Sequence, residues 1–229
     1  MPAKLWKTPY YNLTSRTNED IRIDVTASVS AGLTPNASLL EFINFFHEKR
    51  IEKILDFGGG ALRHTIPLLE EGFQVVVVEF DQQYERSKSK RQLEIAKEYP
   101  NFTKLVFPQD FRRDSYKYDL VLLLYVIQTM PIPSERNTLI RLLTQKMKSE
   151  SYLLYMSRYG QVKDLPIDRE ISDGFFMNPT HKNKTFYRDF SAPETDEMFK
   201  KHKLKRIKTI SKRGTDQIFL YSKGDNKWI

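Results

Sequence analysis

The stretch from Lys53 to Asp81 constrains the fold of this 229-residue chain more than any other. Its sequence, KILDFGGGALRHTIPLLEEGFQVVVVEFD, reads as an apolar strand, a glycine turn, a helix and a second strand with four consecutive valines. A strand that is apolar along its whole length is typical of a parallel sheet covered on both faces. The stretch therefore predicts one βαβ unit, and a ligand is expected in the crevice beyond the carboxyl ends of its strands.

The rest of the chain extends this unit into an α/β domain. The length of the whole chain fits one domain with a full core. Apolar runs predict strands at residues 104–107, 118–125 and 152–156, and a C-terminal hairpin of residues 205–211 and 217–222. Helical periodicity and end signals predict helices over residues 34–50, 62–71, 83–99, 134–148 and 192–202.

Two segments fall outside this regular pattern. Residues 1–33 are polar and aromatic by turns and keep neither a helical nor a strand period, so we expect an N-terminal cap or lid ahead of a domain of residues 34–229. Arg158–Asp189 also lacks a sustained period, contains glycine and proline, and is too long for an ordinary connection. We therefore expect a lid-like insertion at about residues 158–190.

Composition limits the class of protein and its partners. The chain has no cysteine, which excludes disulfides and thiolate metal ligands, and its four histidines are scattered, which argues against a metal site. The N-terminal run MPAKLWKTPYYNL lacks the apolar core of a signal peptide, and no uncharged apolar stretch of about 18 residues is present. We expect a cytoplasmic protein with no membrane partner.

The chain is basic, with 37 Lys and Arg against 29 Asp and Glu and a net charge of +8. Such a charge favours an anionic partner where it gathers on one surface. Lys200–Arg213 (KKHKLKRIKTISKR) holds eight basic residues and no acid. A solvated helix end running into an edge strand explains this segment, and so does a nucleic-acid-binding surface; both explanations stay open.

The glycine turn is the strongest candidate for a binding site. Asp56, Gly58 and Gly60 form an acid-x-Gly-x-Gly pattern directly after a strand, where glycines let the backbone turn tightly and approach a ligand closely. Glu79 ends the next strand, where a carboxylate can accept both hydrogen bonds of a ribose diol. A dinucleotide fingerprint would need a third glycine at the position of Arg63, and no Gly-Lys-Ser/Thr follows to make a P-loop.

These motifs resemble those of the class I S-adenosylmethionine-dependent methyltransferases. DFGGGA is similar to the first motif of that family and VVVVEFD to the second, while Gln109–Phe111 and YDLVLLLYVIQTMP are similar to its adenine-side and fourth-strand segments. The resemblance implies a three-layer, Rossmann-like seven-stranded sheet in the order 3-2-1-4-5-7-6, with the last strand antiparallel. It also implies the cofactor S-adenosyl-L-methionine, bound by Asp56, Gly58, Gly59, Gly60, Glu79, Phe80, Asp110, Phe111 and Tyr125.

The sequence narrows the chemistry to methyl transfer without a covalent enzyme intermediate. No Asn-Pro-Pro-Tyr or Asp-Pro-Pro-Tyr run follows the fourth strand, which disfavours amino methylation of bases by that motif. Without cysteine, methylation of cytosine C5 through a thiolate nucleophile is excluded. Direct displacement depends on aligned atoms and excluded water, so a catalytic base is optional and none is assigned.

Several side chains are candidates for contact with the substrate or cofactor. Those at or beyond the ends of the fourth and fifth strands are Tyr125, Gln128, Tyr155, Arg158 and Tyr159, each of which packing or surface exposure explains equally well. His64 and His181 are further candidates, although a surface histidine is the commoner outcome. The aromatic residues hypothesised to cover the cofactor are Trp6, Tyr10 and Tyr11.

Three functions remain open. The first is an enzyme that methylates an unidentified small molecule, with the N-terminal segment and the insertion closing over it. The second is a DNA or RNA methyltransferase, or methyltransferase-like component, that uses the basic C-terminal face; YVIQTMPIPSER, DGFF and TFYRDF resemble, less specifically, methyltransferases associated with bacterial DNA modification. The third is a non-catalytic domain that binds the cofactor or a partner. The sequence indicates no acceptor atom and no oligomeric state.

Overall fold

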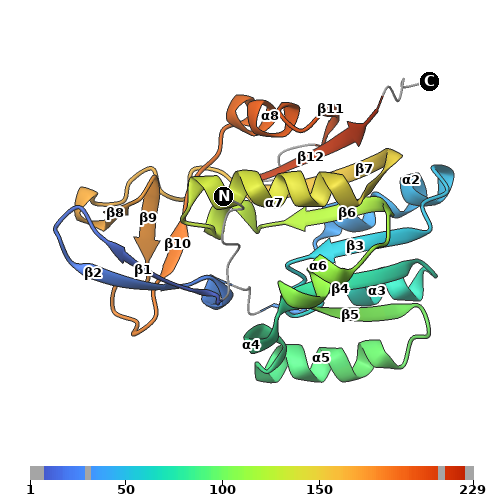
Figure 1. Ribbon diagram of the computed structural model, residues 1–229, viewed down its shortest axis with the longest axis horizontal. Coiled ribbons are helices and arrows are strands. Elements are labelled where there is room, and N and C mark those ends of the chain that lie inside the picture. The colour runs from blue at the N-terminus through green and yellow to red at the C-terminus, as the bar shows by residue number, and fades with distance from the viewer. Residues whose placement is uncertain (1–7, 29–31, 211–214, 225–229) are drawn as a thin grey trace.

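The central element of the computed structural model, which describes residues 8–28, 32–210 and 215–224, is a seven-stranded sheet (Figure 1). Across the sheet the strands are β11 (Leu204–Ile210), β12 (Asp216–Lys223), β7 (Met147–Arg158), β6 (Tyr118–Leu124), β3 (Lys53–Phe57), β4 (Gln74–Phe80) and β5 (Phe102–Phe107). Numbered along the chain and read from the β5 edge, this is the predicted order 3-2-1-4-5-7-6. The last strand, β12, is antiparallel to both neighbours. The predicted fold class is therefore confirmed.

Alternate residues of the strands supply two cores, one on each face of the sheet. In β4, Val76 and Val78 belong to one core, whereas Val75 and Val77 belong to the other. The first core also contains side chains from α6 (Gln109–Arg113), α7 (Pro133–Lys146) and α8 (Ala192–Lys200). The second contains side chains from α1 (Ala37–Leu40), α2 (Ile43–Glu48), α3 (Thr65–Glu70) and α5 (Ser87–Lys97).

Two of the predicted helices are split in the structure. The segment 34–50 forms α1 and α2, and α1 begins after Asn36, whose Oδ1 accepts the Ser38 amide at 2.9 Å as an N-cap. The segment 83–99 forms α4 (Asp81–Tyr84) and α5. Tyr84 is buried, and its hydroxyl donates to backbone carbonyls of β4 and β5 at 3.2 and 3.1 Å. These bonds hold the end of α4 against the sheet, and the chain starts a new helix beyond it.

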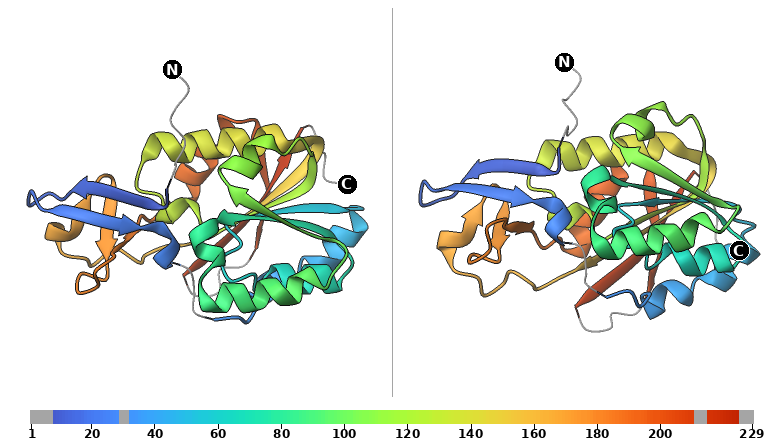
Figure 2. Two further views of the ribbon diagram at one scale, coloured as in Figure 1. Left: turned by 60° about the horizontal axis from the view of Figure 1, so that its bottom comes forward. Right: turned by 90° about the horizontal axis from the view of Figure 1, so that it is seen from below.

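A small β unit stands beyond the carboxyl ends of the parallel strands (Figures 1 and 2). It combines the hairpin β1 (Tyr10–Thr14) and β2 (Asp20–Asp24), the 3₁₀ turn η1 (Val25–Ser28), and the sheet of β8 (Glu170–Ile171), β9 (Gly174–Met177) and β10 (Thr185–Tyr187). Its core consists of Ile21, Ile23, Ile171, Phe176 and Phe186. The N-terminal segment and the insertion, which the sequence predicted as two separate segments, thus fold together. In β2 charged residues alternate with the buried Ile21 and Ile23, a strand period too short to be recognised in the sequence.

Side-chain bonds attach the small β unit to the main domain at two places. On one side Arg86, which precedes α5, donates to Asp24 at 3.2 Å and to Thr26 at 2.8 Å. On the other side Asp173 accepts from Arg136 of α7 and from Arg188, the latter at 2.6 Å. Asp24 and Arg136 are both buried. The unit is therefore held from both sides at the edge of the sheet where a ligand is expected.

Candidate functional site

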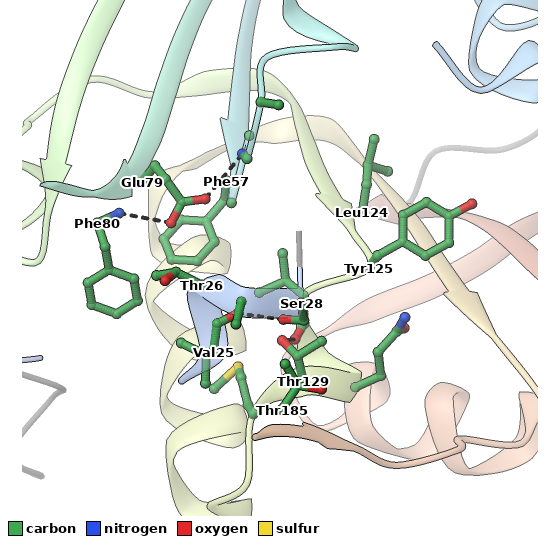
Figure 3. Close-up of a pocket in the computed structure, with 18 of the residues that line it drawn as sticks. Val25, Thr26, Ser28, Phe57, Glu79, Phe80, Leu124, Tyr125, Thr129 and Thr185 are labelled. Atoms are coloured by element: carbon green, nitrogen blue, oxygen red, sulfur yellow. Dashed lines mark hydrogen bonds between the residues drawn. The ribbon is translucent and has the colours of Figure 1, made fainter. Parts of the chain in front are cut away.

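A cavity of about 410 Å³ lies between the small β unit and the carboxyl ends of β3, β4 and β6 (Figure 3). This volume is within the range of small-ligand sites in proteins. The sheet side contributes the glycine turn after β3, the end of β4 and the segment after β6. The small β unit contributes lining residues from η1 and from the ends of β9 and β10, among them Val25, Thr26, Ser28, Met177, Thr185 and Tyr187.

The glycine turn after β3 is packed so tightly that side chains do not fit. Gly58 has a φ of +76°, and a Cβ atom there would lie 2.5 Å from Cγ2 of Val126. A Cβ atom on Gly59 would lie 2.6 Å from Cγ1 of Val77. Gly60 also has a positive φ, of +58°. The backbone of this turn therefore forms one wall of the cavity, where it can approach a ligand closely.

Glu79, at the end of β4, offers the acceptor positions that the two hydroxyls of a ribose diol require. Its Oε2 accepts the Gly60 amide at 3.1 Å and its Oε1 accepts the Phe80 amide at 2.8 Å (Figure 3). A carboxylate offers about four acceptor positions, so two remain for a ligand. Burial raises the pKa of the Glu79 carboxyl to about 7. The carboxylate is thus fixed in orientation by the glycine turn and faces the cavity that it lines.

Asp56 lies beneath the glycine turn, at the end of β3. It is buried, and its Oδ2 accepts the hydroxyl of Thr65 at 2.8 Å. Burial raises the pKa of the Asp56 carboxyl to about 6. Arg63, also in the cavity wall, acts in the opposite direction and favours the ionised carboxylate. The bottom of the site therefore holds two buried acids with raised pKa values and one nearby cation.

Tyr125 follows β6 and is held by a polar cluster at one end of the cavity. Its backbone has a φ of +61°, a conformation that costs energy for a residue other than glycine. Its hydroxyl accepts from Asn36 at 2.9 Å and donates to Asp216 at 3.1 Å. The guanidinium groups of Arg63 and Arg158 lie 5.7 and 5.5 Å from the centre of its ring. Burial raises the pKa of the Tyr125 hydroxyl to about 12, so it stays protonated near pH 7.

The structure brings most of the predicted cofactor-binding residues together. Those that line the cavity are Asp56, Gly58, Gly59, Gly60, Glu79, Phe80 and Tyr125. Asp110 and Phe111 lie outside the lining. The carboxylate of Asp110 accepts the Val106 amide at 2.9 Å, and Phe111, 1% exposed, packs in the core with its ring 5.3 Å from that of Phe57.

The candidates for substrate contact also divide into residues that line the cavity and residues that lie outside it. Gln128, Arg158 and His64 line the cavity, whereas Tyr155 is buried in the core and Tyr159 is 48% exposed. His64 is itself buried, which lowers its pKa to about 3 and keeps it neutral. Its Nε2 and the Oε1 of Gln128 have no hydrogen-bond partner among the described residues. His181 is exposed and lies outside the lining.

The wall formed by the small β unit contains residues that sequence reasoning missed. Thr26, Ser28, Asn178 and Thr185 line the cavity, yet they come from segments far apart in the chain and belong to no shared motif. The aromatic N-terminal segment was a partial indication of this wall, because Tyr11 lines the cavity. Tyr10 instead stacks with Arg22, 4.6 Å from its ring centre, and Trp6 lies outside the described residues.

Two further properties of the described residues bear on the class of site. They contain no group of three or more His, Asp or Glu placed to hold a metal ion. None of the helices formed by residues 8–28, 32–210 and 215–224 is long and apolar enough to cross a membrane.

No protein-family model matches the chain, and a search of curated protein sequences finds no significant match. Solved structures do match. The CcbJ methyltransferase from Streptomyces caelestis superposes with a TM-score of 0.64 at 12% identity, over 88% of this chain and 95% of its own. Magnesium protoporphyrin IX methyltransferase from Synechocystis PCC 6803, with bound SAH, gives a TM-score of 0.58 at 15% identity over 82% and 83%.

A third structure, a proposed O-methyltransferase from Nostoc punctiforme PCC 73102, gives a TM-score of 0.60 at 14% identity and covers 82% of this chain. Here the chain spans only 56% of the length of the matched protein. At such identities the matches concern the fold. The chain has the fold of the class I S-adenosylmethionine-dependent methyltransferases.

Proposed function

We propose that the chain is an S-adenosylmethionine-dependent methyltransferase that acts on a small-molecule acceptor. The observation that carries this proposal is the placement of Glu79. Its carboxylate is clamped by the amides of Gly60 and Phe80, lines the cavity, and keeps acceptor positions for a diol. The shared fold with methyltransferases supports the same cofactor.

The residues of the cavity fit each part of that cofactor. Glu79 would accept the ribose hydroxyls, and the apolar rings of Phe57 and Phe80, which line the cavity beside it, offer a surface for the adenine. The glycine turn and Arg63 would hold the methionine portion, since Arg63 is a cation in the wall beside that turn. When bound, the cofactor supplies an electrophilic methyl group on its sulfonium.

The protein's part in the reaction would be alignment and exclusion of water. The small β unit supplies the wall opposite the sheet, and its bonds to Arg86 and Arg136 hold it there. Tyr125 and His64 are poor general bases, because their pKa values are about 12 and about 3. Neither residue is therefore assigned as a base, and the proposed mechanism is direct displacement by an acceptor atom that is already nucleophilic.

A small acceptor fits the structure better than a nucleic acid. None of the described residues of the basic segment 200–213 lines the cavity. Part of its charge is also neutralised locally, since Arg206 pairs with Asp196 at 2.9 Å and Lys200 with Glu197 at 3.7 Å. A non-catalytic binding domain would show the same cavity, so activity must be measured.

The test is transfer of a labelled methyl group from S-adenosylmethionine to a cell extract separated into metabolite, nucleic-acid and protein fractions. We expect label in the metabolite fraction, and at least a tenfold lower rate for Glu79→Gln at a limiting concentration of donor, because charged hydrogen bonds to the ribose are lost. Glu94→Gln, an exposed change on α5, is the control. Label in nucleic acid would favour a DNA or RNA methyltransferase. Donor that binds without transfer to any fraction would favour a non-catalytic binding domain.

A further inference from the structure

The cavity has two ends of different chemistry. Among its described lining residues the acids are Asp56 and Glu79, and both belong to the glycine-turn end. The opposite end, beside Tyr125, is lined by hydroxyl and amide side chains and by Arg158, while the other cation of the described lining, Arg63, lies 5.7 Å from the same Tyr125 ring. Among the neutral polar residues at this end, Tyr187 bonds to the carbonyl of Arg158, and Gln161 lies in the loop that follows Arg158.

Arg158 is held firmly by its backbone while its side chain remains available. It is the last residue of β7, where it pairs with Asp216 of β12, and its carbonyl accepts the hydroxyl of Tyr187 at 3.3 Å. Its guanidinium contacts Asp216 through Nε at 3.4 Å. This contact uses the inner nitrogen, and the two terminal nitrogens form no hydrogen bond to another described residue, so they could bind a planar, bidentate partner. The side chain is 50% exposed and lines the cavity.

The loop that follows Arg158 is also fixed in place. Asp189 accepts the backbone amides of Gly160, Gln161 and Val162 at 2.9, 3.2 and 3.3 Å. These three bonds use most of the acceptor positions of Asp189 on the loop itself. They also hold Gln161, whose side chain offers an amide donor, at the wall of the cavity next to Arg158.

The charge of the bound cofactor also favours an anionic acceptor. Bound S-adenosylmethionine brings a sulfonium, an ammonium and one carboxylate, a net charge of +1. Asp216, the partner of Arg158, is shared with the hydroxyl of Tyr125 and the amide of Asn36. The positive charges of the bound cofactor and of Arg158 would attract an anionic group, against the opposing charge of Asp216.

We infer that the acceptor carries an anionic oxyacid group, a carboxylate or a phosphate, which Arg158 binds. The inference rests on the proposed methyltransferase function and names the class of its substrate. The acceptor would be held by this anion, with its nucleophilic atom directed toward the glycine-turn end where the methyl group is delivered. Neutral analogues should bind more weakly, because they form no charge-assisted hydrogen bonds with Arg158.

The test uses two matched pairs of small probes, benzoate with benzamide and phenyl phosphate with phenol. Binding is measured by ligand-observed NMR and calorimetry at low salt, on full-length protein saturated with S-adenosylhomocysteine. We expect at least one anion to bind and its neutral partner to bind at least tenfold more weakly. Arg158→Gln should lower the affinity for that anion about tenfold or more. The pair that responds distinguishes a carboxylate from a phosphate.

Two control variants keep the result interpretable. Lys163→Gln removes an exposed cation of the same insertion outside the cavity lining, and it should leave anion binding unchanged. Arg158→Lys keeps the charge but loses the bidentate geometry, and it should retain part of the affinity. For each variant, an S-adenosylhomocysteine affinity within about threefold of the wild type shows that the cofactor end is intact.

The inference is overturned if neither anion binds better than its neutral partner, or if Arg158→Gln binds the anion as well as the wild type does. Both results leave the proposed function standing, provided that S-adenosylhomocysteine binds. Failure of the folded wild type to bind S-adenosylhomocysteine would overturn the proposed function itself, and this inference with it.

Discussion

The two walls of the cavity are built in different ways. Much of the sheet wall comes from one βαβ unit, in which the glycine turn, Asp56 and Glu79 are fixed by the strands of the main core. The opposite wall is a small β unit with a separate core of five buried apolar residues. Side-chain bonds such as Arg86 to Asp24 attach it to the main domain. In the proposed enzyme the sheet wall would bind the cofactor, and the small β unit would form the wall opposite it.

This contrast predicts the largest effect in the glycine turn. Gly58→Ala places a Cβ atom 2.5 Å from Val126 at a positive φ, so we expect affinity for S-adenosylhomocysteine to fall at least tenfold and the free energy of unfolding to fall by about 2–4 kcal/mol. Gly72→Ala is the matched control, since Gly72 also has a positive φ but no atom within 4 Å. It should lose about 1 kcal/mol and keep full affinity. Equal affinities for the two variants would contradict a tightly fitted sheet wall.

The second prediction concerns pH and the carboxylate of Glu79. A diol is bound best by the ionised form, and the pKa of Glu79 is about 7, so affinity for S-adenosylhomocysteine should fall as pH decreases below 7, by up to tenfold per pH unit. Calorimetric titrations from pH 5.5 to 8.5 measure this. In Glu79→Gln the dependence near pH 7 should vanish, leaving only the contribution of Asp56 near pH 6. The same slope in both proteins would assign the titration to another group.

The raised pKa values of the two acids also affect the stability of the ligand-free protein. A carboxyl with a raised native pKa binds its proton more tightly in the folded state, so its contribution is fully present below the unfolded pKa and is lost as pH rises to the native pKa. For Glu79 that window runs from 4.5 to about 7. We expect the free energy of unfolding, measured in urea, to fall across it by about 1–3 kcal/mol, and by less in Glu79→Gln.

A smaller effect is expected where the small β unit is attached. Arg86→Gln leaves the buried Asp24 without its cation, and because Arg86 is 43% exposed we expect a loss of about 1–2 kcal/mol rather than the larger cost of breaking a fully buried pair. Hydrogen exchange should increase in residues 20–28 and remain unchanged in β3 and β4. Lys90→Gln, which removes an exposed pair with Glu85, is the control. Uniform loss of protection across the chain would show that the two walls are one cooperative unit.

The smallest effect on catalysis is expected at Tyr125. Tyr125→Phe removes hydrogen bonds to Asn36 and Asp216, so stability should fall by about 1–2 kcal/mol. Turnover at saturating substrates should stay within about threefold of the wild type, since a hydroxyl with a pKa near 12 is not a base near pH 7. A loss of more than a hundredfold in turnover, with intact cofactor affinity, would make this hydroxyl a participant in the reaction.

The same contrast explains which parts of the protein were predictable from sequence. Glu79 and the glycine turn lie within one βαβ unit, where chain spacing determines spatial proximity. The order of the strands in the sheet was predicted from the family resemblance. The small β unit joins Ile23 to Lys184 across most of the chain, and nothing local in either segment indicates the other. Phe111 was assigned to the site by resemblance, but the structure places its ring in the core.

The most direct test of the account is a calorimetric titration of S-adenosylhomocysteine into the wild type and Glu79→Gln at pH 8, where the carboxylate is ionised. The account predicts saturable one-to-one binding to the wild type and an affinity at least tenfold lower for the variant. No binding by wild-type protein that unfolds cooperatively, or equal affinities for the two proteins, would contradict the claim that Glu79 and the glycine turn form a cofactor site.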